Sequence, residues 1–184
     1  MPSIKKVVIC NPRDYNSLLN KIDNLKNQIE ELLSECNLSL QTEIKCASDL
    51  EKSVKTSDII ITATPSEKAM IKSDWIKEGT HFSCMGACME NKQEIDEKIF
   101  SKAKVYADDI NQCIKSGESQ TAFKQNIISK FSGEIGDIIL NKEKGRTNED
   151  DITIFDSTGL FIQDLATSIE ILNKSNGIGI EVDL

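Results

Sequence analysis

The sequence predicts an α/β protein built on a doubly wound, mostly parallel sheet, and three observations support this class. Short runs of β-branched and other apolar residues recur along the chain. They alternate with segments whose apolar residues are spaced three and four apart, and this alternation of periods is typical of βαβ units. The length of 184 residues suits one main core, because domains commonly contain about 100–150 residues.

The expected elements follow one another in that order. Strands are expected at 4–10, 42–46, 58–62, 80–85, 104–107, 152–155 and 178–184, and helices at 18–33, 95–102, 123–131, 133–140 and 160–172. Residues 58–62 are apolar enough for a strand buried on both faces. Ser48, with Glu51 three residues later, predicts a capping box that opens a further short helix. Asp156 and Ser157 suit the N-cap of the last helix.

Composition excludes several classes of function. Acidic residues outnumber basic ones by eight, and no basic cluster interrupts this excess, so nucleic acid is not expected as a partner. The opening residues lack the apolar run of a secretory signal, and no stretch approaches the roughly 20 apolar residues of a membrane span. We therefore expect a cytoplasmic protein with no membrane partner. The six cysteines contain no Cys-x-x-Cys pair and are expected to be reduced thiols.

A metal site is a weak alternative in one segment. His81, Cys84 and Cys88 lie close together, and all three side-chain types bind zinc. The segment also has the pattern of a strand that runs into a turn, where the three side chains would not converge, and no fourth ligand is evident. No metal is therefore expected.

Chemistry is expected just after the strands, because ligands of doubly wound sheets bind beyond the carboxyl ends of the strands. Four segments with turn-forming or small residues stand there, at 11–13, 62–66, 85–88 and 156–159. Together with their spacing, these four segments are the most specific feature of the sequence.

Three of the segments lie in longer stretches that resemble the ornithine cyclodeaminase/mu-crystallin family. The stretches are SDIIITATPS, GTHFSCMGACMENKQEID and GRTNEDDITIFDSTGLFIQDLA. The resemblance implies a Rossmann-type domain that binds NAD or NADP. It implies use on small amino acids or cyclic imines, as in cyclodeaminases, alanine dehydrogenases and cyclic-imine reductases. The family also contains a vertebrate binding protein.

The resemblance further implies that part of the family's chain is absent. Family members carry an N-terminal dimerisation and substrate domain, then a first Rossmann strand with a glycine-rich phosphate loop. Here the first glycine is Gly79, so we expect a Rossmann-like domain over 1–158 without that strand and loop. Residues 159–184 are expected to form a helix and a strand that return toward the missing domain, and the complete protein is expected to be a homodimer.

Cofactor contacts carry over from the resemblance position by position. The matching residues are Asn11, Arg13, Thr62, Ala63, Thr64, Phe82, Ser83, Cys84, Met85, Lys92, Ser157, Thr158 and Gly159. Arg13 favours NADP over NAD, since an arginine there suits a 2′-phosphate. The structural alternatives are a turn with an exposed arginine, a tight strand exit, and a buried strand followed by a solvated lysine.

Cys88 departs from the family pattern, because it matches the position of the catalytic aspartate in cyclodeaminases. A thiol with an ordinary pKa of about 8.5 is mostly protonated at pH 7 and is a poorer base than a carboxylate. Three interpretations therefore stay open. The chain belongs to an NAD(P)-dependent amino-acid oxidoreductase or cyclodeaminase in which Cys88 is an acid/base, to a non-catalytic NADP(H)-binding protein, or to an inactive truncated or split remnant.

Overall fold

The computed structural model describes residues 4–11, 13–37, 41–142 and 144–180. The chain forms two compact units, Met1–Ser57 and Asp58–Leu184. Within the described residues, strands pair into a two-stranded and a five-stranded sheet, and every pairing is parallel. The predicted α/β class with a parallel sheet is confirmed. The predicted division after residue 158 stays a prediction.

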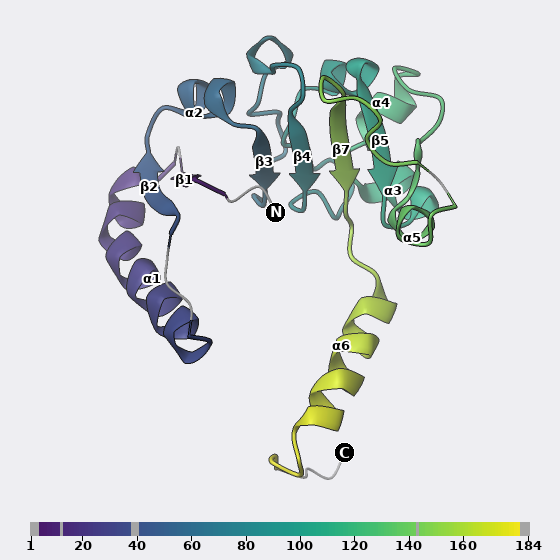
Figure 1. The fold of residues 1–184 in the computed structure, drawn as a ribbon. Helices are drawn as coiled ribbons and strands as arrows, with labels where there is room; N and C mark the ends of the chain where they lie inside the picture. Colours follow the sequence, from purple (N-terminus) through teal and green to yellow (C-terminus); the bar gives the residue numbers. More distant parts are fainter. Residues whose placement is uncertain (1–3, 12, 38–40, 143, 181–184) are drawn as a thin grey trace. The chain divides into compact units, whose positions relative to one another are not determined.

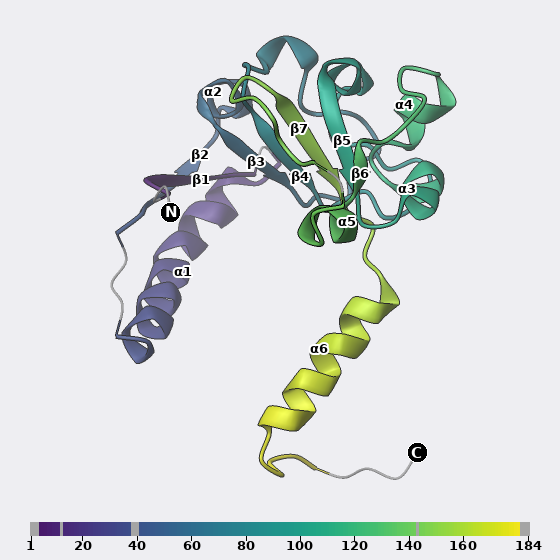
Figure 2. The same ribbon diagram turned by 45° about the vertical axis from the view of Figure 1, so that its right-hand side comes forward.

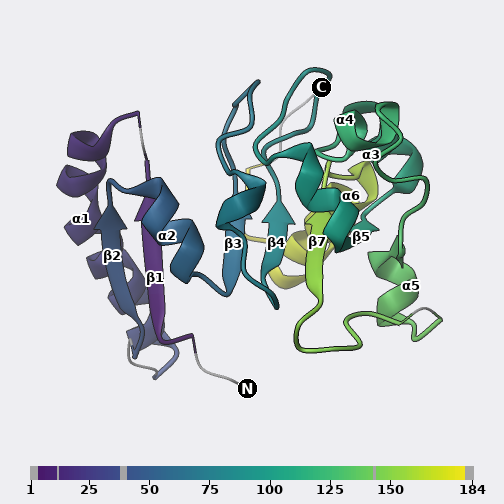
Figure 3. The ribbon, with the colours of Figure 1, turned by 90° about the horizontal axis from the view of Figure 1, so that it is seen from above.

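The first unit contains one βαβ motif followed by a short helix. Strand β1 (Lys6–Cys10) leads to the long helix α1 (Tyr15–Glu35), strand β2 (Glu43–Ala47) and helix α2 (Leu50–Thr56). Figure 3 shows α1 alongside the paired strands, with α2 beside β1. Among the described residues, the small core of this unit contains three buried apolar side chains from α1, β2 and α2, which are Ile22, Ile44 and Val54.

The second unit is built on a five-stranded sheet in the order β3-β4-β7-β5-β6. Its strands are β3 (Ile59–Thr62), β4 (His81–Cys84), β5 (Ala103–Ala107), β6 (Gly133–Glu134) and β7 (Ile152–Asp156). Figure 1 shows the arrows of β3, β4, β7 and β5 side by side and pointing the same way. The last strand in the described part of the chain, β7, is thus inserted between two earlier strands, β4 and β5.

The second unit also contains helices. They are the 3₁₀ helices η1 (Ser73–Trp75) and η2 (Glu97–Lys102) and the α-helices α3 (Ile110–Ser116), α4 (Gln120–Lys124), α5 (Ile135–Ile139) and α6 (Phe161–Lys174). Figure 2 shows α3 and α4 near β5, and α5 at the end of β6. The described part of the chain contains no helix that is long and apolar enough to cross a bilayer.

The main core of the second unit lies on one face of its sheet. Phe82, Val105 and Ile154 project from neighbouring strands on that face and are almost completely buried, as are Ile95 and Ile99 around η2. The other face is more open. Ile59 is 55% exposed and Ile61 is 69% exposed, while Ile60 between them is buried. The expectation that 58–62 is buried on both faces is therefore wrong, because Ile59 and Ile61 point to the open face while Ile60 points to the core.

The two predicted helix caps are wrong in detail. Asp49, and not Ser48, is the N-cap of α2, and its carboxylate accepts a hydrogen bond from the Lys52 N–H at 2.9 Å. Helix α6 begins at Phe161, where the Leu160 N–H donates to the Gln163 side chain. Asp156 does not cap it, since its carboxylate is buried and bonded elsewhere.

The region after β5 also differs from expectation. The predicted helix at 123–131 ends at Lys124, because Asn126 has a φ of 58°, in the left-handed region that stops a helix. Helix α3 was not predicted. Residues 97–102 form a 3₁₀ helix where a longer helical segment was expected. Residues 178–180 are not in a strand, and the rest of the predicted terminal strand, 181–184, lies outside the described residues.

Candidate functional site

Three of the four predicted segments meet at the carboxyl edge of the five-stranded sheet. They follow β3, β4 and β7, which are adjacent strands and end in register at Thr62, Cys84 and Asp156. The Met85 N–H donates to the Thr62 carbonyl at 2.8 Å, and the Ser157 N–H donates to the Cys84 carbonyl at 3.0 Å. The turns that leave these strands are therefore hydrogen-bonded neighbours.

The β3 turn, residues 62–66, is held by a carboxylate from elsewhere in the chain. Thr62 is buried, Thr64 is half-buried and Ala63 between them is exposed. The Thr64 N–H donates to Glu94 Oε1 at 2.6 Å. The turn thus exposes Ala63 and Pro65 to solvent, while the Glu94 carboxylate holds its backbone.

The Cys88 loop, residues 85–91, is held by the same carboxylate. The Gly86 N–H donates to Glu94 Oε2 at 3.1 Å. Cys88 itself is exposed. Lys92, at the end of the loop, donates from Nζ to the Pro65 carbonyl at 2.7 Å, so its ammonium group ties this loop to the β3 turn.

The third turn is organised by Asp108, which stands at the end of β5. Its carboxylate accepts hydrogen bonds from the Ser157 hydroxyl at 3.1 Å, the Thr158 N–H at 2.9 Å and the Gly159 N–H at 2.8 Å. Burial alone would raise the pKa of Asp108. Hydrogen bonds from the Gly159 and Asp109 N–H groups and from the Cys113 and Ser157 side chains nevertheless hold the pKa of Asp108 below its ordinary value. Asp108 therefore stays ionised and keeps the turn in one conformation.

The predicted contacts along β4 divide between two environments. Phe82 and Cys84 are 0% and 1% exposed and belong to the core, whereas Ser83 is half-buried and Met85 is exposed. Burial raises the pKa of the Cys84 thiol well above its ordinary value, so it is a packed thiol. Contact of Phe82 or Cys84 with a cofactor stays a prediction.

The fourth predicted segment lies in the first unit, after β1. The Asn11 side chain accepts hydrogen bonds from the Arg13 and Asp14 N–H groups, each at 3.2 Å. Asp14 in turn caps α1 through the Ser17 N–H. Both Asn11 and Arg13 are exposed, and residue 12 lies outside the described residues. Asn11 thus has a structural role as a turn former, and Arg13 exposes its side chain.

A series of buried carboxylates under the edge was missed by the sequence analysis. Asp156 accepts hydrogen bonds from the Glu118 N–H at 3.0 Å and the Ser119 N–H at 2.9 Å. Glu118 accepts from the Glu94 and Ile95 N–H groups, both at 2.7 Å. The Asp156 carboxylate therefore binds the backbone of Glu118, and the Glu118 carboxylate binds the backbone of Glu94. The series ends at the Glu94 carboxylate, which binds the two turns.

Burial controls the protonation of this series. It raises the pKa of Glu118 to about 8 against the backbone donors that lower it, and the neighbouring charges of Glu94 and Asp156 raise it further. The pKa of Asp156 is also raised, again chiefly by burial. Glu118 Oε2 is buried and has no hydrogen-bond partner among the described residues. A neutral Glu118 lowers the repulsion between three acids packed in one core.

The weak metal alternative gains no geometric support. His81 and Cys84 stand on opposite faces of β4, since side chains alternate along a strand. His81 Nδ1 lies 2.8 Å from the Thr153 hydroxyl. Burial and the nearby Arg146 lower the pKa of His81. No cluster of three potential metal ligands occurs within the part of the chain that the structure describes.

The GRT segment supports the opposite end of the sheet. Arg146 donates to the Gly79 carbonyl at 2.8 Å. Asp151 accepts from the Thr147 and Asn148 N–H groups and from Lys104. The Lys104 ammonium group and these donors lower the pKa of Asp151. This part of the motif is thus structural and remote from the carboxyl edge.

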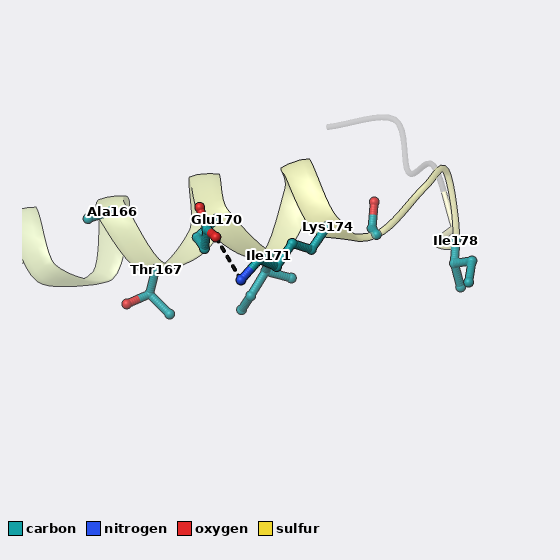
Figure 4. A pocket seen from close by; sticks show the side chains of 7 residues that line it. Ala166, Thr167, Glu170, Ile171, Lys174 and Ile178 are labelled. Carbon is teal, nitrogen blue, oxygen red and sulfur yellow. Dashed lines mark ion pairs between the residues drawn. The ribbon is translucent and has the colours of Figure 1, made fainter. Parts of the chain in front are cut away.

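Two open hollows lie away from the edge. One is on the more open face of the sheet, beside α5, and is bounded by Ile59, Ile138 and Phe155 among others. The other lies along α6, where Ile171 projects beside the Glu170–Lys174 ion pair and Ile178 follows beyond the end of the helix (Figure 4). Ile171 and Ile178 are largely exposed, so this hollow is an apolar helix surface and encloses no ligand site.

Comparison with known proteins gives one family. The model of the ornithine cyclodeaminase/mu-crystallin family matches residues 18–177. Alanine dehydrogenase of Archaeoglobus fulgidus is 42% identical over 113 residues, which are 60% of this chain and 35% of that protein.

Solved structures agree over nearly the whole chain. The Thermococcus litoralis Δ1-pyrroline-2-carboxylate reductase in complex with NADH and L-proline matches 98% of this chain and 53% of its own, with a TM-score of 0.80 and 25% identity. An archaeal alanine dehydrogenase dimer with bound NAD matches with the same coverage, a TM-score of 0.77 and 28% identity. The chain therefore spans about half the length of these structures.

Proposed function

Because the chain belongs to the ornithine cyclodeaminase/mu-crystallin family, we propose that it is the cofactor-binding part of an NAD(P)-dependent amino-acid oxidoreductase. The observation that carries this proposal is the gathering of three family segments at one carboxyl edge, at 62–64, 86–88 and 157–159. That edge is where doubly wound sheets bind nucleotides. The NAD and NADH held by the solved neighbours support the same cofactor class.

The residues at the edge fit a nucleotide that lies close to the backbone. Ala63 is exposed, and a methyl group added at Gly159 would meet nothing within 4 Å, so both turns leave open space beside the main chain. Thr64 and Thr158 contribute side chains at the same edge. Arg13, exposed after β1, favours NADP, because its guanidinium group suits a 2′-phosphate.

The proposed chemistry is oxidation or reduction at the α-carbon of a small amino acid or cyclic imine. The bound nicotinamide supplies the acceptor or donor of the hydride. Loss of the hydride and of one proton from the amine converts an amino acid to an imine, which is then cyclised or hydrolysed; the reverse reaction reduces the imine. Cys88, exposed in the loop that follows β4, is the residue of this chain proposed to take or give the proton.

A non-catalytic NADP(H)-binding protein is the second candidate, and Cys88 itself favours it. A thiol stands where the family resemblance places a catalytic carboxylate, and a thiol is the weaker base near pH 7.

The third candidate is an inactive remnant that associates with a further polypeptide. Ile59 and Ile61 expose apolar surface on β3, and the second edge of β3 pairs with no described strand. Cytoplasmic location and a homodimer are proposed with the enzyme.

Titration with NADH and with NADPH, followed by NMR of backbone amides, tests cofactor binding. We expect the amide signals of residues 63, 64, 158 and 159 to shift, because these lie at the proposed site. The signals of 144–151, at the other end of the sheet, are the internal control and should not move. Saturating cofactor that leaves the edge signals unchanged would contradict the proposal.

Exchange of Cys88 for aspartate separates the enzyme from the binding protein. In the protein as its source organism makes it, Cys88→Asp is expected to raise turnover at pH 7 by about 10²-fold, the lower range of a general acid/base contribution. Nicotinamide absorbance with ornithine, alanine or a cyclic imine measures it. Cys36→Asp, at another exposed cysteine, should have no effect. Activity that appears only in the Cys88→Asp variant would identify the native chain as a binding protein, and equal turnover in both forms would remove Cys88 from the chemistry.

A further inference from the structure

The Glu94 carboxylate joins two loops that leave adjacent strands. Oε1 accepts the Thr64 N–H at 2.6 Å and Oε2 accepts the Gly86 N–H at 3.1 Å. Its two oxygens therefore each hold one loop, and the planar carboxylate fixes the separation between the two N–H groups.

Glu94 is itself held in place and screened from water. It is 0% exposed. Its own N–H donates to Glu118 Oε1 at 2.7 Å, and its carbonyl accepts the Met70 N–H at 2.8 Å. No lysine or arginine pairs with it within the described ranges. The carboxylate is thus committed to the two backbone donors.

Two further contacts tie the same segments together. The Lys92 ammonium group binds the Pro65 carbonyl at 2.7 Å, and the Gln93 N–H donates to the Ser66 carbonyl at 2.9 Å. All three contacts run from residues 92–94 to the β3 turn. The side chain of Glu94 is distinct among them, because it alone also reaches back to Gly86, two residues before Cys88.

We propose that Glu94 is a positioning residue that sets the distance between the Cys88 loop and the β3 turn, so that the two loops form one binding surface for the nicotinamide half of the cofactor. This inference rests on the proposed function. Glu94 acts through the Thr64 and Gly86 N–H groups, and it needs two acceptor oxygens for them. A glutamine would present an amide NH₂ to one of these donors, and one loop would lose its anchor.

Glu94→Gln is the test variant, and Asp151→Asn is its matched control. Asp151 is also a carboxylate that accepts two backbone N–H groups, from Thr147 and Asn148, but at the opposite end of the sheet. Both variants lose a charge and one acceptor oxygen from a carboxylate that holds backbone N–H groups, although at Asp151 a single oxygen, Oδ2, accepts both N–H groups and also binds Lys104. A general loss of stability should therefore appear in both variants, whereas an effect confined to the carboxyl edge should appear in Glu94→Gln alone.

Amide hydrogen exchange and the NADH titration are measured on both variants under conditions where each is folded. Glu94→Gln is expected to speed exchange at Thr64 and Gly86 and to weaken NADH binding by about tenfold, the equivalent of one lost hydrogen bond to a charged group. Asp151→Asn is expected to leave all three quantities at the values of the unaltered chain.

The outcomes distinguish the inference from the proposed function. Unchanged exchange at Thr64 and Gly86 in Glu94→Gln, or NADH bound as tightly as by the unaltered chain, would overturn the positioning role alone. An equal loss of NADH binding in Asp151→Asn would also overturn it, since the effect would then be general. Absence of NADH binding by the unaltered chain would overturn the proposed function and the positioning role with it.

Discussion

Gly86→Ala is expected to lower the free energy of unfolding by about 3 kcal/mol, at the upper end of the usual cost of overpacking. A methyl group at this position would lie 2.4 Å from Glu94 Oε2 and 2.4 Å from the Thr64 carbonyl oxygen. The carbonyl belongs to the backbone and the carboxylate is fixed by its own hydrogen bonds, so neither can move without breaking a contact. The Cys88 loop must therefore shift away from the β3 turn. Urea unfolding measures the loss.

Gly136→Ala is the matched control for this substitution. Gly136 lies in α5, and a methyl group there would meet nothing within 4 Å. Alanine is a better helix former than glycine by up to about 1 kcal/mol, so the control is expected to be neutral or slightly stabilising. If both variants unfold at the same urea concentration, the close packing under Gly86 is not what stabilises this edge.

Glu118→Gln is expected to remove a pH dependence that the unaltered chain shows between about pH 4.5 and 8. The folded-state pKa of Glu118 is raised to about 8 from an ordinary value of 4.5, first by burial. The unfolded chain releases this proton near pH 4.5, whereas the folded chain keeps it until pH 8. The stability contribution is therefore complete below pH 4.5 and is lost as the pH rises to 8.

The expected size follows from linkage. One proton contributes about 1.4 kcal/mol per pH unit between the two pKa values, so the unaltered chain should lose roughly 3–5 kcal/mol over this range through Glu118. Glutamine cannot ionise, so the free energy of unfolding of the Glu118→Gln variant should not change with pH through this residue. Urea unfolding at pH 5 and pH 8 measures the difference, with Glu149→Gln, at an exposed site, as the control. A variant that retains the full pH dependence would mean that Glu118 does not titrate in this range.

The strands and the fold class were predictable from the sequence, because β-branched runs such as 58–62 and the stripe of α1 carry their periodicity locally. The insertion of β7 between β4 and β5 was not. It depends on how residues 108–151 return across the sheet, and no local pattern encodes that path. Helix α3 was not predictable either, because its seven residues are too few to show a helical period.

The positions of the site segments were predictable, but what holds them was not. Turns after parallel strands meet at one edge by geometry alone, so 62–66, 85–88 and 157–159 could be grouped from the sequence. The burial of Glu94, Glu118 and Asp156 could not be predicted, because an acidic residue in a loop or at the end of a strand is ordinarily solvated. Their burial is a property of the packed molecule. Glu94 and Asp156 did stand in stretches that carried the family resemblance, and the resemblance was the available signal for them.

The two ends of the five-stranded sheet should respond differently to ionic strength. At the amino end, Lys77 with Asp58 and Lys104 with Asp151 are pairs that water and dissolved ions reach, and added salt weakens such pairs by screening. At the carboxyl edge, Glu94, Glu118 and Asp156 are bound to backbone N–H groups out of reach of ions. Salt therefore loosens the supporting end of the sheet and leaves these buried carboxylates unchanged, while at the carboxyl edge it acts on exposed charges such as the Lys92–Glu67 pair and on the phosphates of a bound cofactor.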